Sequence, residues 1–294
     1  MKVFLPGATG LIGSAVALAL QRAGHTVMGL ARSEAAQQKL LDRRMLVRRG
    51  DLSQTDILVH AAEESQAIIW TAADAKASER DPVNVAAMLE KCSGTGKAFI
   101  YTAGVWDFGD TGGKAVDEKS PYNPLPLVMW RPAVNEMVLD AVSRDIQSVV
   151  ILPSFVYGYG GGIPGMLVNS ARETGAARLI GSGENHWGFV HADDLADLYV
   201  RALQAPGGTK LIASTGQAYL AKDIAEAASR GAGADGKVTI VPVEEARKTM
   251  GPFADALVAD THTKSDRARK LLGWQPMGPS ILDDLDHGSY IEQR

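Results

Sequence analysis

Short apolar runs alternate with amphipathic stretches through the first half of the chain. The apolar run 2–5 precedes apolar residues at helical spacing over 11–20, and this order recurs to about residue 152. It predicts strands at 2–5, 26–30, 45–47, 67–70, 98–101 and 148–152, and further helices at 54–64, 82–92 and from 132 to about 143. Because helices and almost wholly apolar strands alternate, we expect an α/β fold with a doubly wound parallel sheet of the Rossmann type.

The pattern changes after Pro153. A glycine-rich loop follows at 157–162, and the later elements are shorter and less regular. We predict a main domain over 1–155, whose sheet is completed by about 189–215 through a helix at 192–203 and a strand at 210–213. The remaining segments, 156–188 and 216–294, are expected to form a smaller substrate-binding lobe over the ends of the strands.

Composition excludes several classes of protein. The 294 residues carry a net charge of -4, which gives no basic surface for nucleic acid. The single cysteine, Cys92, permits neither a disulfide framework nor a cysteine-based metal site. No secretory signal and no apolar run of the roughly 20 residues that span a membrane is present. We expect a cytoplasmic protein, a monomer or a homodimer, that acts on a small molecule.

The strongest motif is the sequence GATGLIG at 7–13, between a predicted strand and a predicted helix. Gly7 permits a tight turn, Gly10 lets the backbone approach a pyrophosphate, and Gly13 allows the helix to pack closely on the strand. Free amide groups at the start of the helix bind an anionic diphosphate. The motif therefore predicts a bound dinucleotide, the alternative being a turn without a ligand.

The residue that ends the second strand usually decides between NAD and NADP. An acidic side chain there binds the ribose hydroxyls and repels a 2′-phosphate. This chain has Ala31 at that position, followed by Arg32 and Ser33. Arginine offers a planar fork of donors suited to phosphate, and serine adds a hydroxyl. NADP(H) is therefore favoured over NAD(H), unless Arg32 only begins a solvated helix with Glu34.

Five further segments occur in a characteristic order: 50–52 (GDL), 71–73 (TAA), 153–158 (PSFVYG), 189–196 (FVHADDLA) and 272–276 (LGWQP). With the glycine turn, they resemble the extended short-chain dehydrogenases/reductases, often called the NAD-dependent epimerase/dehydratase family. The resemblance spans nearly the whole chain. It implies that 50–52 contacts adenine, that 71–73 lines the cofactor, and that the segment from 153 lies beside the nicotinamide.

Motif and resemblance together give the expected cofactor-binding residues. They are Gly7, Thr9, Gly10, Leu11, Ile12, Gly13, Arg32, Ser33, Asp51, Leu52, Thr71, Ala72, Ala73, Pro153, Ser154, Phe155 and Val156.

The chain departs from the family at the catalytic residues. The family uses a Tyr-x-x-x-Lys pair at the start of helix five, with a serine or threonine after strand five. When Glu136 is aligned with the family's helix-five glutamate, Val128 takes the tyrosine position and Pro132 the lysine position. No tyrosine of the chain has a lysine four residues later. The resemblance therefore indicates an atypical member.

Four residues are candidates for the catalytic groups. Thr102, after the strand 98–101, matches the family's serine or threonine after strand five. Alternatively, it is a strand-end threonine that satisfies the local backbone. Tyr157, Tyr159 and His186 are candidate acids. Tyr157 belongs to a packing motif and is more often structural, Tyr159 lies in the glycine-rich loop, and His186 resembles the segment where extended members contact substrate.

Other side chains leave alternatives open. Arg131 is either an anchor for ribose or substrate or a surface cation beside Pro132. Tryptophans 106, 130 and 187 either wall an apolar substrate pocket or form ordinary core.

A metal site is not expected. The candidates are His186, His191, Asp193 and Asp194, but they lack the helical pairing of a zinc motif. We expect the histidine to order a turn and one aspartate to cap the following helix.

Three functions are compatible with these residues. The first is an NADP(H)-dependent oxidoreductase that acts on a small carbonyl or alcohol, with Thr102 polarising the oxygen. The second is a non-catalytic NADP(H)-binding sensor, which would be expected to lack the tyrosine and lysine. The third, nucleotide-sugar epimerisation or dehydration, depends most on the missing pair. The sequence favours the first.

Overall fold

Seven parallel strands form the central sheet within residues 1–291, the part of the chain that the computed structural model describes. They are β1 (Lys2–Leu5), β2 (Thr26–Ala31), β3 (Leu46–Arg49), β4 (Ala67–Trp70), β5 (Ala98–Thr102), β6 (Gln147–Pro153) and β10 (Thr209–Ala213). Their order is β10-β6-β5-β4-β1-β2-β3. The predicted doubly wound parallel sheet is confirmed. The strand order reverses at β1, and open sheets of this kind bind ligands beyond the carboxyl ends of the strands at such a reversal.

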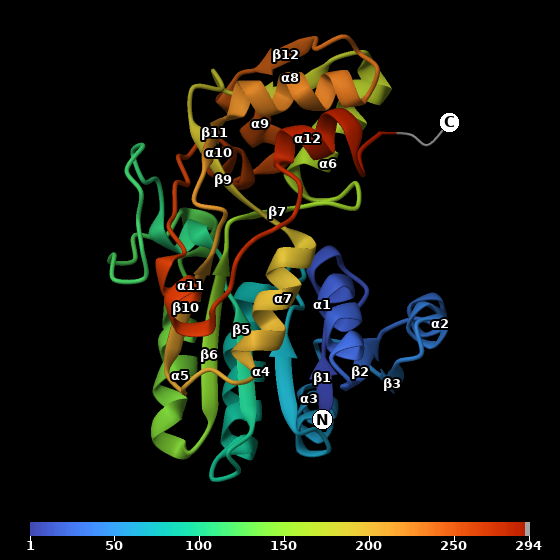
Figure 1. Cartoon of the computed structure of the whole chain (residues 1–294), viewed down its shortest axis with the longest axis vertical. Helices are drawn as coiled ribbons and strands as arrows, with labels where there is room; N and C mark the ends of the chain where they lie inside the picture. Colours follow the sequence, from blue (N-terminus) through green and yellow to red (C-terminus); the bar gives the residue numbers. More distant parts are fainter. Residues whose placement is uncertain (292–294) are drawn as a thin grey trace.

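Helices cover both faces of the sheet because successive side chains of a strand point to opposite sides. Val3 and Leu5 share one buried cluster with α1 and α7, which lie against each other, whereas Phe4 packs on the other face with α3 and α4 (Figure 1). The first layer contains α1 (Leu11–Arg22), α2 (Glu34–Asp42), α7 (Ala192–Ala202) and α11 (Asp266–Leu272). The second contains α3 (Thr55–Glu63), α4 (Ala77–Cys92) and α5 (Arg131–Asp140).

The remaining elements form a second group above the carboxyl ends of the strands, in the upper part of Figure 1. One sheet has the order β11-β9-β7 and another pairs β12 with β8. The strands are β7 (Phe155–Tyr157), β8 (Ala177–Ile180), β9 (His186–His191), β11 (Ala218–Leu220) and β12 (Val238–Val241). The helices are α6 (Gly162–Thr174), α8 (Ala221–Gly231), α9 (Val243–Met250), α10 (Phe253–Leu257) and α12 (Ile281–His287).

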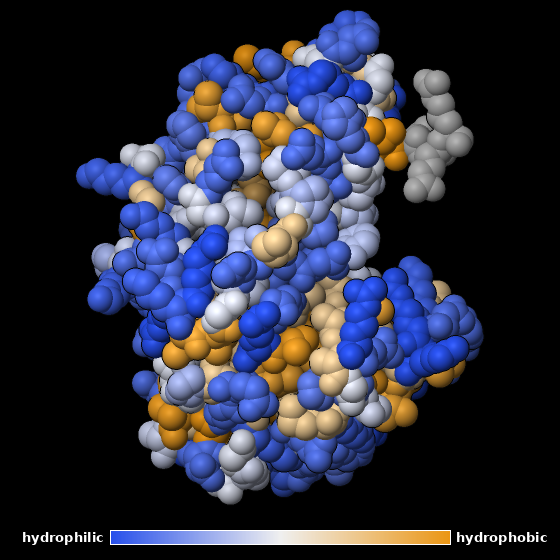
Figure 2. All heavy atoms as spheres, viewed as in Figure 1, coloured by the Kyte–Doolittle hydropathy of each residue, from blue (hydrophilic) through white to orange (hydrophobic). Residues whose placement is uncertain are grey.

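The described residues also contain three 3₁₀ turns: η1 (Val105–Phe108), η2 (Pro126–Val128) and η3 (Ala141–Arg144). On the face shown in Figure 2 hydrophilic side chains predominate, and hydrophobic ones gather mainly in the lower half, around α7. None of the helices in residues 1–291 is both long and apolar enough to span a lipid bilayer.

One helix begins earlier than predicted. The sequence predicts a helix at 82–92, but α4 begins at Ala77 and contains Pro82 in its interior. The residues before the proline are held by tertiary contacts, since Asp81 is buried and accepts hydrogen bonds from two side chains of the sheet. The helix predicted from Pro132 begins one residue earlier, and its α-helical part ends at Asp140.

Candidate functional site

The turn between β1 and α1 leaves no room for side chains at two of its glycines. Gly7 has φ +91°, and a Cβ built on it would lie 2.6 Å from the carbonyl carbon of Thr71. A Cβ on Gly13 would lie 2.1 Å from the carbonyl oxygen of Gly7. Backbone thus packs directly on backbone where β1 and β4 end, and only glycine fits.

The N-terminus of α1 is open to an anion. Gly10 occupies the cap position without any side-chain hydrogen bond, and the first turn contains no acidic residue. A Cβ on Gly10 would have one neighbour within 4 Å, the oxygen of Gly7 at 3.4 Å. The first amide groups of a helix lack intrahelical partners and attract negative charge. The turn therefore fits the diphosphate of a dinucleotide.

Two cavities meet at this turn, and Gly10, Thr71 and Ala73 line both. The first, of about 410 Å³, extends past the ends of β2 and β3 to Arg32 and Asp51. The second, of about 480 Å³, extends past the ends of β5 and β6. An elongated ligand can run from one cavity into the other across the glycine turn, as the two halves of a dinucleotide would.

All predicted cofactor-binding residues except Ser33 line one of these cavities. Those of the first are Gly7, Thr9, Gly10, Arg32, Asp51, Leu52, Thr71, Ala72 and Ala73. The second adds Leu11, Ile12, Gly13, Pro153, Ser154, Phe155 and Val156. The hydroxyl of Ser33 instead accepts a hydrogen bond of 3.2 Å from the amide of Ala36 and caps α2.

Two guanidinium groups, those of Arg32 and Arg80, line the first cavity. Arg80 is ion-paired with Asp74, which lines the cavity too. Hydrogen bonds from Ser53 lower the pKa of the Asp51 carboxyl, and the positive charges of Arg80 and Arg32 lower it further. Sequence reasoning missed Arg80, because it lies on α4 outside every recognisable motif and only the fold brings it to the cavity of Arg32.

Arg131, the first residue of α5, lines the second cavity. Its side chain is 20% exposed, and its Nη1 lies 3.5 Å from Oδ1 of Asp107, which is fully buried on η1. The guanidinium also lies over the ring of Trp130, 5.4 Å from the centroid. A Cβ on Gly104 would lie 3.1 Å from Nη1, so the glycine makes room for the guanidinium. Arg131 is thus held inside the cavity and is not the surface cation that the sequence left open.

Asp107, the counter-ion of Arg131, is also held by a second side chain. Nδ2 of Asn135 donates a hydrogen bond of 2.6 Å to Oδ2 of Asp107. Burial raises the pKa of Asp107 to about 6, against the opposing effect of Arg131 and Asn135. Trp106 lines the same cavity, and its buried Nε1 has no hydrogen-bond partner within the described chain. The second cavity therefore combines an apolar wall with one cation held by a buried carboxylate.

A second buried carboxylate, that of Asp81, belongs to α4 in the second helix layer. Oδ2 of Asp81 accepts hydrogen bonds from Trp70 Nε1 at 3.2 Å and from the Tyr101 hydroxyl at 2.9 Å. Asp81 is 3% exposed, and burial raises its pKa to about 6, although the hydrogen bonds from Tyr101 and Trp70 and the charge of Arg131 lower it. The positive charge of Arg131 thus lowers the pKa of both buried carboxylates, Asp81 on α4 and Asp107 on η1.

Replacing Asp81 with asparagine should stabilise the protein at high pH only. The native carboxyl keeps its proton up to a pKa of about 6, whereas an unfolded aspartate loses it near 3.8. The unfolding free energy of the natural protein therefore falls as pH rises between these values. Asp81→Asn keeps an acceptor for Trp70 and Tyr101 and should raise the unfolding free energy by roughly 3 kcal/mol at pH 8 but little at pH 4.

Urea denaturation at the two pH values measures this difference. Asp56→Asn, at an exposed position at the start of α3, is the matched control and should change stability little at either pH. An equal effect of Asp81→Asn at both pH values would contradict the electrostatic explanation.

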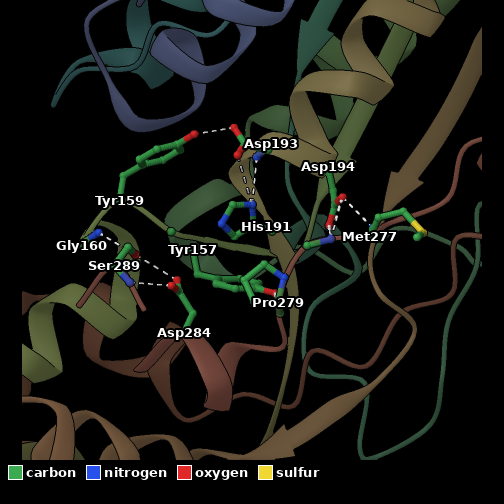
Figure 3. A network of polar contacts seen from close by, with 12 residues as sticks. Tyr157, Tyr159, Gly160, His191, Asp193, Asp194, Met277, Pro279, Asp284 and Ser289 are labelled. Carbon is green, nitrogen blue, oxygen red and sulfur yellow. Dashed lines mark hydrogen bonds and ion pairs between the residues drawn. The ribbon is translucent and has the colours of Figure 1, made fainter. Parts of the chain in front are cut away.

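The four candidate catalytic side chains do not meet at the second cavity. The Thr102 hydroxyl lies 2.5 Å from the hydroxyl of Tyr199, which is fully buried on α7. The Tyr157 hydroxyl donates to the carbonyl oxygen of Pro279 at 2.5 Å, and the Tyr159 hydroxyl donates to Oδ1 of Asp193 at 2.6 Å (Figure 3). These three residues are not part of the lining of the second cavity, and their part in turnover stays a prediction.

The two histidines are held in different ways. Nδ1 of His186 lies 3.2 Å from Oδ1 of Asp260, and its side chain is 43% exposed. His191 orders a turn as expected, because its Nδ1 accepts a hydrogen bond from the amide of Asp193 and thereby caps α7. The expectation that an aspartate is the cap was wrong. The Asp194 carboxylate instead accepts from the amides of Met277 and Gly278 and fixes the C-terminal segment (Figure 3).

No group of three or more histidine, cysteine, aspartate or glutamate side chains within residues 1–291 is arranged to hold a metal ion.

Comparison with known proteins places this geometry in a family. The sequence model of the NAD dependent epimerase/dehydratase family matches residues 3–212. The protein belongs to this family. It has the NAD(P)-dependent fold of this family, and its relatives include reductases and epimerases.

Two proteins are similar to the chain in sequence, and a third is similar in structure. An uncharacterized protein of Saccharomyces cerevisiae is 32% identical over 97% of this chain and 98% of its own length. The 3-diazoavenalumate denitrifying reductase of a Streptomyces species is 25% identical over 97% of this chain and 99% of its own. The dTDP-glucose 4,6-dehydratase of Bacillus anthracis, solved with NAD, has the same fold. Its TM-score is 0.83 at 15% identity, with 98% of this chain and 95% of that chain covered.

Proposed function

We propose that this protein is an NADP(H)-dependent oxidoreductase that acts on a small carbonyl or alcohol. The observation that carries the proposal is the second cavity, where the guanidinium of Arg131 lines the same space as the turn 10–13 and the segment 153–156. A nicotinamide held by these segments would supply the hydride chemistry, and the protein would supply position and electrostatics. A family relative named as a reductase is consistent with this chemistry.

The residues present fit the rest of the dinucleotide. The open N-terminus of α1 would bind the diphosphate, and the first cavity would hold the adenosine. Arg32 would bind a 2′-phosphate. Arg80 in the same cavity is ion-paired with Asp74, so the preference for NADP(H) over NAD(H) rests on Arg32.

Arg131 would stabilise the charge that develops on the substrate oxygen. A donor that is already oriented stabilises an oxyanion without reorganisation, and in a site shielded from water this effect is large. Asp107 and Asn135 hold the guanidinium in place before substrate arrives. The oxygen then takes its proton from one of the candidate acids Tyr157, Tyr159 and His186, or from water. In the direction of alcohol oxidation, the same cation stabilises the alkoxide before it loses hydride.

Anaerobic NADPH consumption, followed by absorbance against a panel of aldehydes, ketones and enones, tests the proposal. We expect substrate-dependent oxidation of NADPH, with a weaker response to NADH. Tight NADPH binding without turnover of any substrate would instead support a non-catalytic sensor. Interconversion of nucleotide sugars without net NADPH consumption would support the epimerase alternative.

A further inference from the structure

A third cavity, of about 300 Å³, lies among the elements above the sheet, between α6, β8, β12 and α9. Its lining is largely aliphatic, thioether and aromatic, and includes Ile163, Met166, Leu179, Trp187 and Met250. A cavity lined in this way suits a flexible apolar group rather than an ordered polar one.

This cavity shares a wall with the second cavity, where Arg131 lies. Ile163, in the first turn of α6, lines both cavities. The ring of Phe155, which lines the second cavity, contacts Trp187 of the third with 5.6 Å between centroids. The same Phe155 contacts Trp106 at 5.5 Å. A row of contacting aromatic rings therefore lies between the space beside the predicted nicotinamide and the apolar cavity.

We infer that the third cavity binds the uncharged alkyl or aryl tail of the carbonyl substrate while its oxygen lies at Arg131. This inference rests on the proposed function, since it names the class of substrate that the same site takes. A chain of several carbons extending past Ile163 would bury its apolar surface against Met166, Leu179 and Trp187. Each buried methylene should then strengthen binding about fourfold until the cavity is full.

The polar side chains of the lining do not suit a nucleotide diphosphate. The Ser170 hydroxyl already donates to the oxygen of Leu167 at 2.8 Å and accepts from the amide of Arg178 at 3.0 Å. Glu245 also lines the cavity and would repel a diphosphate. The one lysine or arginine of the described lining, Arg178, is exposed to solvent, where an ionic contact contributes little.

Binding can be measured without cofactor or turnover. The uncharged fluorophore N-phenyl-1-naphthylamine is titrated into the purified protein and displaced with 1-butanol, 1-hexanol and 1-octanol, and with UDP-glucose for comparison. Displacement should strengthen about fourfold for each added methylene. UDP-glucose should displace the fluorophore poorly. Equal affinity for the three alcohols, or preferential binding of UDP-glucose, would overturn the inference.

A variant that fills the third cavity tests whether the alcohols bind there. Ala246 is buried and lines the cavity from α9, so a phenyl ring at this position must enter it. Ala246→Phe should weaken 1-octanol binding at least about tenfold and 1-butanol binding much less. Lys248→Phe, exposed on the same helix and outside the lining, is the matched control and should change neither. Thr249→Phe, at an exposed position of the lining, replaces Ala246→Phe if that variant does not fold.

Turnover assays distinguish a failure of this inference from a failure of the proposed function. With NADPH, kcat/KM should rise from butanal to octanal, and Ala246→Phe should remove most of that rise. Unchanged 1-octanol binding in both cavity variants would overturn the inference even if aldehydes are reduced. Conversely, 1-octanol binding that is lost in Ala246→Phe, together with no NADPH oxidation by any aldehyde, ketone or enone of the panel, would reject the proposed function and still support an apolar chain in this cavity.

Discussion

Arg32→Glu is expected to weaken NADPH binding about 100-fold and to leave NADH binding within about threefold of its natural value. Arg32 lines the first cavity, where the adenosine ribose of the cofactor would lie. The substitution removes charge-assisted hydrogen bonds to the 2′-phosphate and places a carboxylate against it, whereas NADH has no phosphate there. Titration calorimetry with each reduced nucleotide measures the two affinities directly.

Lys39→Glu provides the matched control for this change. It reverses the same charge at an exposed position of α2 that does not line the cavity. We expect less than a twofold loss of NADPH affinity, because exposed charges at a distance are screened by salt. Equal losses of NADPH and NADH affinity in Arg32→Glu would reject the NADP(H) assignment. Failure of the natural protein to bind either nucleotide would reject the dinucleotide site itself.

Arg131→Met is expected to lower kcat about 100-fold or more while changing the dissociation constant of NADPH by less than about threefold. Removal of one oriented donor to an oxyanion has effects of this size. Methionine retains much of the apolar volume that packs against Trp130, so the main loss is the cation in the second cavity. Single-turnover reduction of a substrate found in the carbonyl panel, followed by NADPH absorbance, isolates the chemical step.

The single variant leaves the buried carboxylate of Asp107 without its cation, which is strongly destabilising in general. Arg131→Met combined with Asp107→Asn removes both charges and should recover stability without recovering kcat. Arg144→Met, at an exposed position of η3, controls for loss of an arginine elsewhere. Natural activity in the double variant would exclude Arg131 from the chemistry.

The candidate catalytic groups are best assayed beside these variants. Tyr159→Phe and His186→Gln each remove one candidate acid, and Thr102→Val removes the hydroxyl expected to polarise the oxygen, while Arg131 stays in place. The donor should be recognised by a loss of about 100-fold in kcat, the usual contribution of a positioned acid. Similar rates in all of them would indicate Tyr157 or water as the source of the proton.

The sequence alone determined the sheet and the glycine turn. Apolar runs of buried parallel strands and helical spacing over 11–20 are local patterns, and they predicted the confirmed fold. The turn 7–13 is determined partly in the same local way, because a Cβ on Gly13 would meet the oxygen of Gly7 within one strand-turn-helix unit. The order of short motifs along the chain was enough to predict the family that the residues 3–212 match.

Only the tertiary structure decided which charged side chains share a cavity. Arg80 and Arg32 lie on different elements, and nothing in the sequence pairs them at the first cavity. Arg131 could be an anchor or a surface cation until the fold placed fully buried Asp107 beside it. The apolar third cavity likewise exists only between packed elements distant in sequence. Local sequence sets backbone conformation within a few residues, whereas burial and electrostatic environment depend on long-range packing that no short pattern contains.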